Sequence, residues 1–469
     1  IEDGNNYYSL SQTRSRSAAF FANATYSYKG RYTVNGTARY EGTNRMGKSR
    51  SARWLPTWNV SGAWNAHEEK FFSNLTSVLS HFTLKASYSL TADRGPADVT
   101  NSQAIITSYS PYRPFTSIQE SGLYIKELEN SELTYEKKHE LNIGADMGFL
   151  NNRINLAVDW YKRNNYDLIG IVNTQGAGGQ ILKYANIASM KSHGIEFTLS
   201  TKNIKTKDFN WNTDFIFSNA KNEVTDLKQN ANVMELISGN GFAKQGYPVR
   251  GLFSIPFVGL DKDGIPVIIN EKGEATSTDI NFQERQNTGF LKYEGPTDPT
   301  ITGSLGNMFS YKGFRLNLFI TYSFGNVIRL NPVFKAYYSD LTAMTREFKN
   351  RWTLPGDEAK TNVPAILSKR MYDSNEDLKY AYNAYNYSTE RIAKGDFIRL
   401  KEISLAYDFP KAWINPLKLT DLSLKVQATN LFLIYADDKL NGQDPEFFNA
   451  GGVASPVPRQ FTITLRLGL

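Results

Sequence analysis

Strict alternation of apolar and polar residues over two neighbouring stretches constrains this chain more than any other feature. From 139 to 149, and again from 154 to 161, nearly every second side chain is apolar, and the polar pair Asn151-Asn152 lies between the two stretches. Successive side chains of a strand point to opposite faces, so this period predicts a β-hairpin with one apolar and one polar face. A soluble β-sandwich and a membrane barrel would both produce such a hairpin. Strand number and connection lengths must distinguish them.

The same alternation recurs along the whole chain. Besides the two strands of residues 135–166, it predicts strands at 20–28, 32–40, 54–64, 82–90, 194–200, 208–218, 301–311, 314–324, 396–409, 422–428 and 461–469, about thirteen in all. Lys29-Gly30 and Lys312-Gly313 predict tight two-residue turns. Ile398 is even-numbered while Ile403 is odd-numbered, so the phase slips, and we predict a β-bulge at Lys401-Glu402.

The predicted connections alternate between short and long. Turns of about 2 to 14 residues alternate with loops of roughly 11, 45, 26, 78, 69 and 28 residues. Outer-membrane barrels have this arrangement, because their periplasmic turns are short and their extracellular loops are long. No stretch approaches the roughly 18 consecutive apolar residues of a membrane helix. The predicted fold class is therefore all-β, a transmembrane antiparallel β-barrel with long extracellular loops.

An odd number of strands makes a further prediction. Bacterial single-chain barrels have an even number of strands and must close, because an open sheet edge cannot persist in hydrocarbon. We therefore expect residues 1–469 to be the C-terminal part of a larger barrel of about 22 strands, the class with a plugged lumen. Strands, and a plug, would then precede this chain.

Composition argues against several other functions. The chain has no Cys, and its net charge of +7 comes from Lys and Arg spread among acids, which favours solvated loops and a polar lumen over nucleic-acid binding. The four histidines, at 67, 81, 139 and 193, are far apart in sequence. We therefore expect no catalytic site, cofactor or metal site. Asp261-Lys262-Asp263-Gly264 lacks the later acidic ligands of a calcium loop, so a hairpin turn is the better interpretation.

Two sets of residues are candidates for substrate binding. Polar side chains on the alternating strands predict a lumen lined by Thr33, Asn35, Arg39, Lys85, Glu140, Asp146, Asp159, Glu196, Asp214, Arg315, Lys425 and Gln427, from which Arg39, Arg315 and Lys425 are site candidates. Aromatic clusters in the loops form the second set, which comprises Tyr109, Tyr112, Arg113, Phe115, Tyr337, Tyr338 and Trp352. Such rings stack on sugars or grip peptide side chains. The alternative is that they pack the loops against themselves or against a partner.

Six segments resemble the C-terminal half of SusC/RagA-type TonB-dependent transporters. They are residues 38–72, 84–95, 131–169, 186–224, 298–325 and 395–410, in the family's order. The resemblance implies an active importer of oligosaccharides or oligopeptides in the Gram-negative outer membrane. It implies a SusD-like lipoprotein as an extracellular lid, energy from TonB-ExbB-ExbD through an N-terminal region, and a possible dimer of SusC–SusD pairs. A signal peptide, TonB box, plug and early strands would lie upstream.

Two alternatives remain open at this point. A passive porin fits the barrel pattern equally well and would need neither plug nor lipoprotein. A surface adhesin built from soluble β-sandwiches would also alternate, although its strands would fold without lipid.

Overall fold

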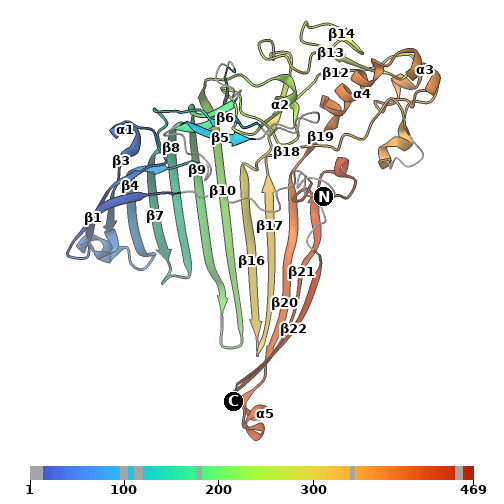
Figure 1. The fold of residues 1–469 in the computed structure, drawn as a ribbon. Helices are drawn as coiled ribbons and strands as arrows, with labels where there is room; N and C mark the ends of the chain where they lie inside the picture. The colour runs from blue at the N-terminus through green and yellow to red at the C-terminus, as the bar shows by residue number, and fades with distance from the viewer. Residues whose placement is uncertain are drawn as a thin grey trace.

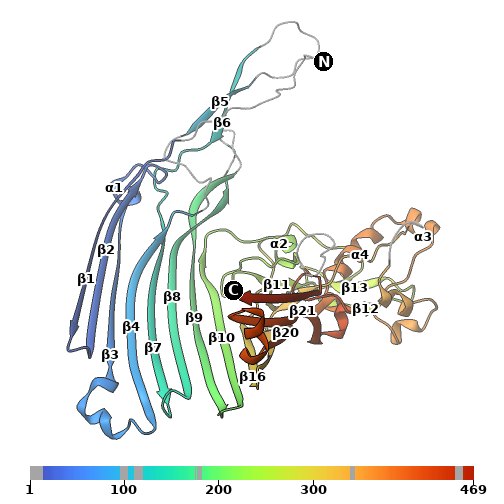
Figure 2. The same cartoon turned by 90° about the horizontal axis from the view of Figure 1, so that it is seen from below.

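One antiparallel sheet of thirteen strands dominates the computed structural model, which describes residues 14–95, 104–109, 120–174, 176, 182–338, 344–448 and 458–468 (Figure 1). Each strand pairs with the next along the sheet, in the order β1 (Ser17–Tyr28), β2 (Tyr32–Thr43), β3 (Trp54–Asn65), β4 (Leu79–Asp93), β7 (Glu136–Phe149), β8 (Ile154–Asn173), β9 (Leu182–Lys205), β10 (Phe209–Leu227), β16 (Ile301–Tyr311), β17 (Phe314–Phe324), β20 (Phe397–Asp408), β21 (Asp421–Ala436) and β22 (Gln460–Gly468). The predicted number of strands is confirmed. Figure 2 shows that the sheet curves into a wall.

The register gives this wall one polar and one apolar face. Lys85 of β4 pairs with Gly144 of β7, which in turn pairs with Asp159 of β8. Farther along the sheet, Arg315 of β17 pairs with Ala406 of β20, which pairs with Lys425 of β21. We call the side that carries these charged residues the inner face. The other side, the outer face, carries Val34, Ile143, Trp160 and Ile463 in matching positions. The predicted division into lumen residues and outward apolar residues is therefore confirmed by strand pairing.

The first predicted hairpin is present as β7 and β8. Ile143 pairs with Trp160, and the turn between the strands has positive φ at Leu150, Asn151 and Asn152. The strands β8, β9 and β10 are, however, longer than predicted, so the connection from β8 to β9 is shorter than the 26 residues expected from the sequence. Their upper parts do not alternate: in β8 the polar run Arg163-Asn164-Asn165 is followed by the apolar run 168–172, so the period that identifies a strand disappears there.

The predicted bulge and turns are also present. In β20, Leu400 and Glu402 pair with the adjacent residues Ile320 and Phe319, so Lys401 is the extra residue of a bulge. Lys312 and Gly313 form a two-residue turn with φ of 43° and 91°. The turn after β1 is one residue longer than predicted, because Tyr28 pairs with Tyr32.

The two longest connections, residues 228–300 and 325–396, fold together into a compact body above the sheet, which we call the loop assembly (Figure 1). Its elements are α2 (Val233–Ile237), β11 (Gly251–Ser254), β12 (Phe257–Leu260), β13 (Pro266–Ile269), β14 (Ala275–Thr276), β15 (Lys292–Pro296), β18 (Val327–Arg329), η3 (Arg346–Asn350), η4 (Asp357–Ala359), α3 (Lys369–Ser374), α4 (Leu378–Asn386), η5 (Thr389–Arg391) and β19 (Ile392–Lys394).

Two hydrophobic clusters hold the loop assembly together. One centres on α2 and includes Phe253, Ile255 and Ile268, and the other centres on α4 and includes Phe334 and Tyr382. None of the twelve largest fully buried side chains among the described residues belongs to the thirteen strands of the sheet. The loops, rather than the wall, contain the protein's own core.

Shorter connections carry the remaining elements. These are α1 (Arg50–Arg53), η1 (Ala66–Glu68), η2 (Lys70–Asn74), the hairpin of β5 (Ile105–Tyr109) and β6 (Gly122–Glu127), α5 (Lys411–Ile414), η6 (Asn415–Leu417) and η7 (Asp438–Leu440). Across the described ranges, we find no helix with the length and apolar character needed to cross a membrane.

Candidate functional site

The inner face of β2, β3, β4, β7 and β8 forms a polar surface with mixed charge. The Lys85 ammonium lies 2.8 Å from the Asp146 carboxylate, and Glu140 bridges Arg163 and Lys138, each at 3.0 Å. A recess of about 310 Å³ opens between Asn35, Lys85 and Asn142. Because opposite charges alternate on this surface, it suits uncharged or zwitterionic polar ligands better than a strongly charged polymer.

Gly144 makes room for one of these carboxylates. A Cβ at this position would lie 2.3 Å from an Asp159 oxygen, so the Asp159 side chain lies directly over the glycine backbone. Any larger residue in the middle of β7 would displace that carboxylate from the inner face.

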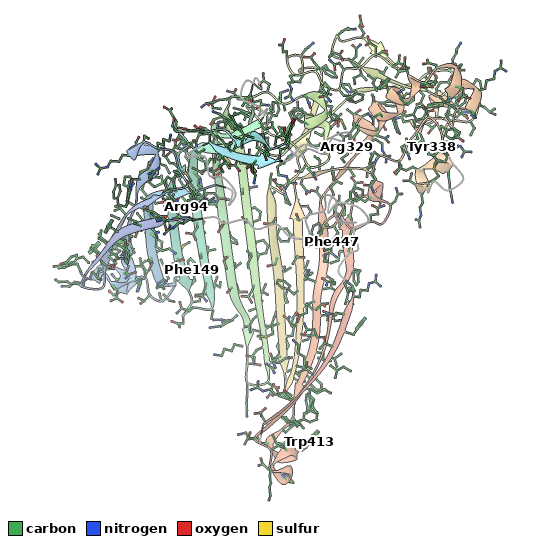
Figure 3. The ribbon with its side chains drawn as sticks, viewed as in Figure 1. Arg94, Phe149, Arg329, Tyr338, Trp413 and Phe447 are labelled. Carbon is green, nitrogen blue, oxygen red and sulfur yellow. The ribbon has the colours of Figure 1, made fainter. Side chains whose placement is uncertain are left out.

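Arg39 lies higher on the same face, near the long-loop rim. The Glu41 carboxylate pairs with both Arg39 and Arg94 (Figure 3 labels Arg94). A recess of about 390 Å³ at this point is lined by the three charged residues together with Thr57 and Tyr135. Arg39 thus lies on the inner face with the other predicted lumen residues, and two guanidinium groups share one carboxylate there.

Arg315 and Lys425 lie on the inner face toward the short-turn rim. Arg315 pairs with Asp408 at 2.9 Å, and Lys425 is 3.8 Å from Glu402. They are aligned through Ala406 in the register. They are remote in the register from Arg39, so the structure does not bring the three predicted cations into one cluster.

The predicted aromatic residues of the loop assembly contribute to its packing. The Tyr338 hydroxyl accepts a hydrogen bond from the Lys335 N–H at 2.8 Å, and burial raises the pKa of this hydroxyl (Figure 3). Trp352 donates its indole N–H to Glu358 at 2.9 Å and packs against the cluster around α4. Tyr337 is more exposed and stacks on Tyr372, with ring centroids 6.2 Å apart.

Tyr109 belongs to a separate hairpin. It ends β5, its ring meets the edge of Tyr124 at 5.6 Å, and it is 49% exposed. Tyr112, Arg113 and Phe115 lie outside the described residues. The described aromatic candidates therefore occupy two places, the β5–β6 hairpin and the loop assembly, and the described cations Arg39, Arg315 and Lys425 occupy the wall.

Three buried arginines that the sequence pattern did not reveal join the connections to one another. Arg329 is 4% exposed and donates to the carbonyls of Ser388 and Phe253, at 2.7 and 2.6 Å, so it ties the two long connections together. Burial lowers its pKa to about 9. Figure 3 shows its position at the base of the loop assembly.

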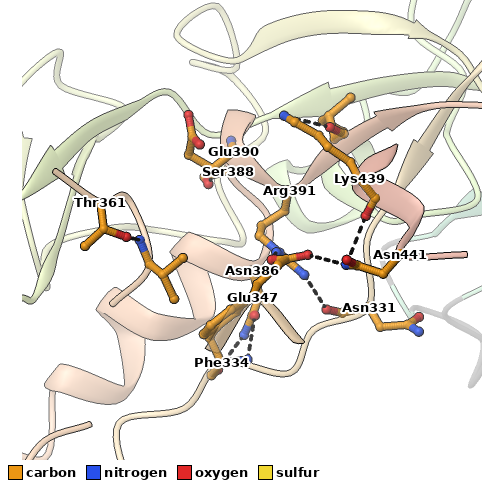
Figure 4. A network of polar contacts seen from close by, with 12 residues as sticks. Asn331, Phe334, Glu347, Thr361, Asn386, Ser388, Glu390, Arg391, Lys439 and Asn441 are labelled. Carbon is orange, nitrogen blue, oxygen red and sulfur yellow. Dashed lines mark hydrogen bonds and ion pairs between the residues drawn. The ribbon is translucent and has the colours of Figure 1, made fainter. Parts of the chain in front are cut away.

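Arg391 makes a second such junction. It pairs with Glu347 and donates to the carbonyl of Asn331 at 3.3 Å, while the Asn441 amide donates to the same Glu347 at 3.1 Å (Figure 4). This network links the loop assembly to the connection after β21. Pairs of this kind leave no signal in a single sequence, because their members lie 44 to 94 residues apart.

Arg399 fixes the connection after β21 to the wall. Its guanidinium donates to both oxygens of Asp444, at 2.6 and 2.7 Å, and is 3.1 Å from Glu446. Beside Arg399, β21 and residues 437–448 enclose a recess of about 920 Å³. Phe432 and Phe447 are among the residues that line it (Figure 3 labels Phe447).

His67 and His81 are not isolated in space, since their ring centroids are 4.3 Å apart at the short-turn rim. Within the described ranges, no group of three or more acidic or histidine side chains is arranged to hold a metal ion. Asp261 uses its carboxylate to accept the N–H groups of Asp263 and Ile265, at 2.8 and 2.9 Å, which is a turn geometry and agrees with the predicted hairpin.

A curved antiparallel sheet with a charged inner face and an apolar outer face, short turns at one rim and folded loops at the other, defines a section of an outer-membrane β-barrel wall. The sequence profile described as "TonB dependent receptor-like, beta-barrel" matches residues 1–431. The chain therefore belongs to the TonB-dependent receptor β-barrel family, whose members are outer-membrane transport proteins and not enzymes.

Curated relatives and solved structures agree with this assignment. The chain is 25% identical to TonB-dependent receptor P3 of Formosa agariphila, covering 91% of this chain and 41% of the relative, and 26% identical to TonB-dependent receptor SusC of Bacteroides thetaiotaomicron, covering 97% and 44%. The structure superimposes on that of the RagAB peptide transporter with a TM-score of 0.77 at 23% identity, covering 97% of this chain and 47% of that one. The chain thus spans less than half the length of the curated relatives that it matches.

Proposed function

We propose that this chain is the C-terminal part of the barrel of an active outer-membrane importer of oligosaccharides or oligopeptides. The observation that carries the proposal is the pairing of a mixed-charge inner face with a folded loop assembly at the long-loop rim, in a chain of the TonB-dependent receptor family. In the proposed arrangement, preceding strands complete the barrel beside β1 and β22, and a plug fills the lumen.

The proposed partners follow the same reasoning. RagAB is a peptide importer, and the fold of this chain matches part of its structure. We propose that a SusD-like lipoprotein covers the loop assembly as a lid, that TonB-ExbB-ExbD acts through the N-terminal region, and that two such pairs form a dimer. Outer-membrane lipid surrounds the outer face. We propose no nucleic-acid partner.

The other two hypotheses have less support. A soluble β-sandwich adhesin would place two sheets face to face, whereas the strands of this wall form a single sheet. A passive porin has no use for the TonB system that gives this family its name.

Two measurements test the proposal. Native mass spectrometry of the detergent-extracted complex should show a lipoprotein of SusD size and a plug-bearing segment together with this chain. Uptake of labelled oligosaccharide or oligopeptide pools by intact cells should stop when a protonophore collapses the proton gradient. Uptake that continues without the gradient, by a chain without partners, would indicate a passive barrel.

A further inference from the structure

A recess with an aromatic floor and a cationic margin lies on the outer face, at the long-loop rim. It has a volume of about 460 Å³ and is lined by Phe20, Tyr40, Lys48, Arg50, Arg53 and Trp54. The cations are on the side of the wall that faces lipid, so a substrate moving through the lumen would not meet them.

Strand pairing places the aromatic floor on the outer face. Phe20 lies opposite Tyr40, and Gly42 lies opposite Trp54, in the same register that directs Val34 outward. The Tyr40 and Trp54 rings are stacked, with centroids 5.1 Å apart and planes 24° apart. A Cβ on Gly42 would lie 2.4 Å from the indole, so the indole rests flat on the strand only because this residue is glycine.

The connection between β2 and β3 supplies the cations. Lys48 pairs with Glu129 at 2.8 Å, whereas Arg50 and Arg53 form no ion pair with any residue in the described ranges. The Nε atom of Arg53 is enclosed and finds no hydrogen-bond acceptor among those residues. Within the part of the chain that the structure describes, two guanidinium groups beside an aromatic floor therefore lack an anion.

This connection is held firmly in place. Met46 is fully buried with Leu133, and the Gly47 and Lys48 N–H groups donate to the carbonyls of Leu133 and Ser131, at 2.8 and 2.9 Å. The Ser49 hydroxyl accepts the Ala52 N–H at 3.1 Å and caps α1. Since the backbone is already ordered, a ligand would not have to order it.

We propose that this recess binds a phosphorylated glycolipid of the outer leaflet, with its phosphate held by Arg50 and Arg53. Guanidinium groups bind phosphate oxygens through paired, charge-assisted hydrogen bonds. The aromatic floor suits a sugar ring, and the apolar outer face of β1, β2 and β3 continues below it for the acyl chains. Charge, position at the extracellular rim and continuity with the lipid-facing surface select this class of ligand.

The test uses the full-length protein that contains this chain, purified in detergent and titrated with lipid A while native mass spectrometry counts the bound lipid. Diphosphorylated lipid A should bind at least about tenfold more tightly than the same lipid stripped of its phosphates, the difference that charge-assisted hydrogen bonds produce. The double variant Arg50→Gln/Arg53→Gln should lose this preference. Gly42→Ala displaces the indole and leaves both arginines in place, so it should weaken the binding of both lipids to a similar degree.

A matched control removes the same charge from the opposite rim. Both residues of the control variant Lys312→Gln/Lys411→Gln are at the short-turn rim, Lys312 in the turn between β16 and β17 and Lys411 at the start of α5. This variant should retain the preference for phosphorylated lipid. Heat-modifiable migration in gels verifies that every variant forms a barrel. The proposal is overturned if dephosphorylated lipid A binds as tightly as the phosphorylated form. It is also overturned if the lysine control variant loses the preference for phosphorylated lipid to the same extent as the arginine variant. If millimolar inorganic phosphate saturates the site and lipid A does not compete with it, the recess is a site for soluble anions, and the proposal is again overturned.

Discussion

Phe461 and Ile463 in the wall are each 74% exposed, whereas Phe253 and Ile255 in the loop assembly are 1% and 0% exposed. The wall turns its apolar side chains away from the protein, toward lipid. The loop assembly turns them inward, as a small water-soluble domain does. The two regions therefore depend on different solvents, and a substitution of the same kind should have different consequences in each.

The largest difference should come from removing an aromatic ring. Phe253→Ala would leave a cavity beside Tyr247 and Tyr293, whose rings lie 4.9 and 5.3 Å away, and should destabilise the loop assembly by about 3–5 kcal/mol. Phe461→Ala on the outer face should cost about 1–2 kcal/mol, because lipid can fill the space. Native-state hydrogen exchange of loop and strand peptides measures both values. Equal costs would show that the two regions are not distinct.

The second comparison places a charge on either face of one strand. Ile143→Arg directs a guanidinium to the outer face and should cost roughly 2–4 kcal/mol of barrel stability in lipid vesicles. Asn142→Arg, one residue earlier, directs it to the inner face and should cost little. Refolding both variants with and without lipid checks this expectation. A soluble adhesin would show the same cost in both media.

The third comparison tests whether an exposed aromatic side chain in a loop binds the ligand or only packs against its neighbours. Tyr109→Ala should lower affinity for the transported oligomer about five- to tenfold, the contribution of one ring contact, without changing barrel stability. Ser108→Ala on the same strand serves as the control. Ligand titration by calorimetry provides the measurement, and unchanged affinity would remove Tyr109 from the site.

The smallest effect should be a pH dependence confined to the loop assembly. Asp357 accepts hydrogen bonds from the Leu354 N–H, at 3.0 Å, and from the backbone and hydroxyl of Thr353, which lower its pKa to about 2. Because the folded pKa lies below the usual value of 3.8, this stabilisation is complete above about pH 4 and is lost as the pH falls toward 2.

Pepsin digestion between pH 2 and 5 can follow this change. Asp357→Asn should make the turn at residues 353–360 equally susceptible throughout the range, while the native protein becomes more susceptible only at the acidic end. Asp263→Asn is the control, since the Asp263 carboxylate accepts no hydrogen bond from the residues that the structure describes. A pH profile unchanged by Asp357→Asn would contradict the assigned role.

Sequence periodicity predicted the wall because a strand between lipid and water must alternate. Strand number, inner-face residues such as Arg39 and Lys425, and the bulge at Lys401 all followed from that period. The same rule explains the failure at the tops of β8, β9 and β10, where polar and apolar residues no longer alternate and the period vanishes.

The loop assembly could not be predicted in this way. Its core joins short segments without a common period, and its junctions depend on single residues such as Arg329, whose partners are 59 to 76 residues distant. Tyr338 and Trp352 were candidates for ligand binding with loop packing as the alternative, because an aromatic residue in a loop has the same appearance in sequence whether it packs or binds. The His67–His81 contact was missed for a related reason: the two residues flank the connection between β3 and β4, and the alternation pattern does not show how that connection folds back.

The length of β9 has a consequence for how the protein meets its surroundings. Its 24 residues extend roughly 80 Å at about 3.4 Å per residue, which at a tilt near 40° is a height of roughly 60 Å, against an apolar band of about 25 Å. More than half of the strand therefore lies outside the apolar band. A wall of this height extends well beyond the hydrocarbon layer, so the loop assembly at its long-loop rim lies away from the acyl chains.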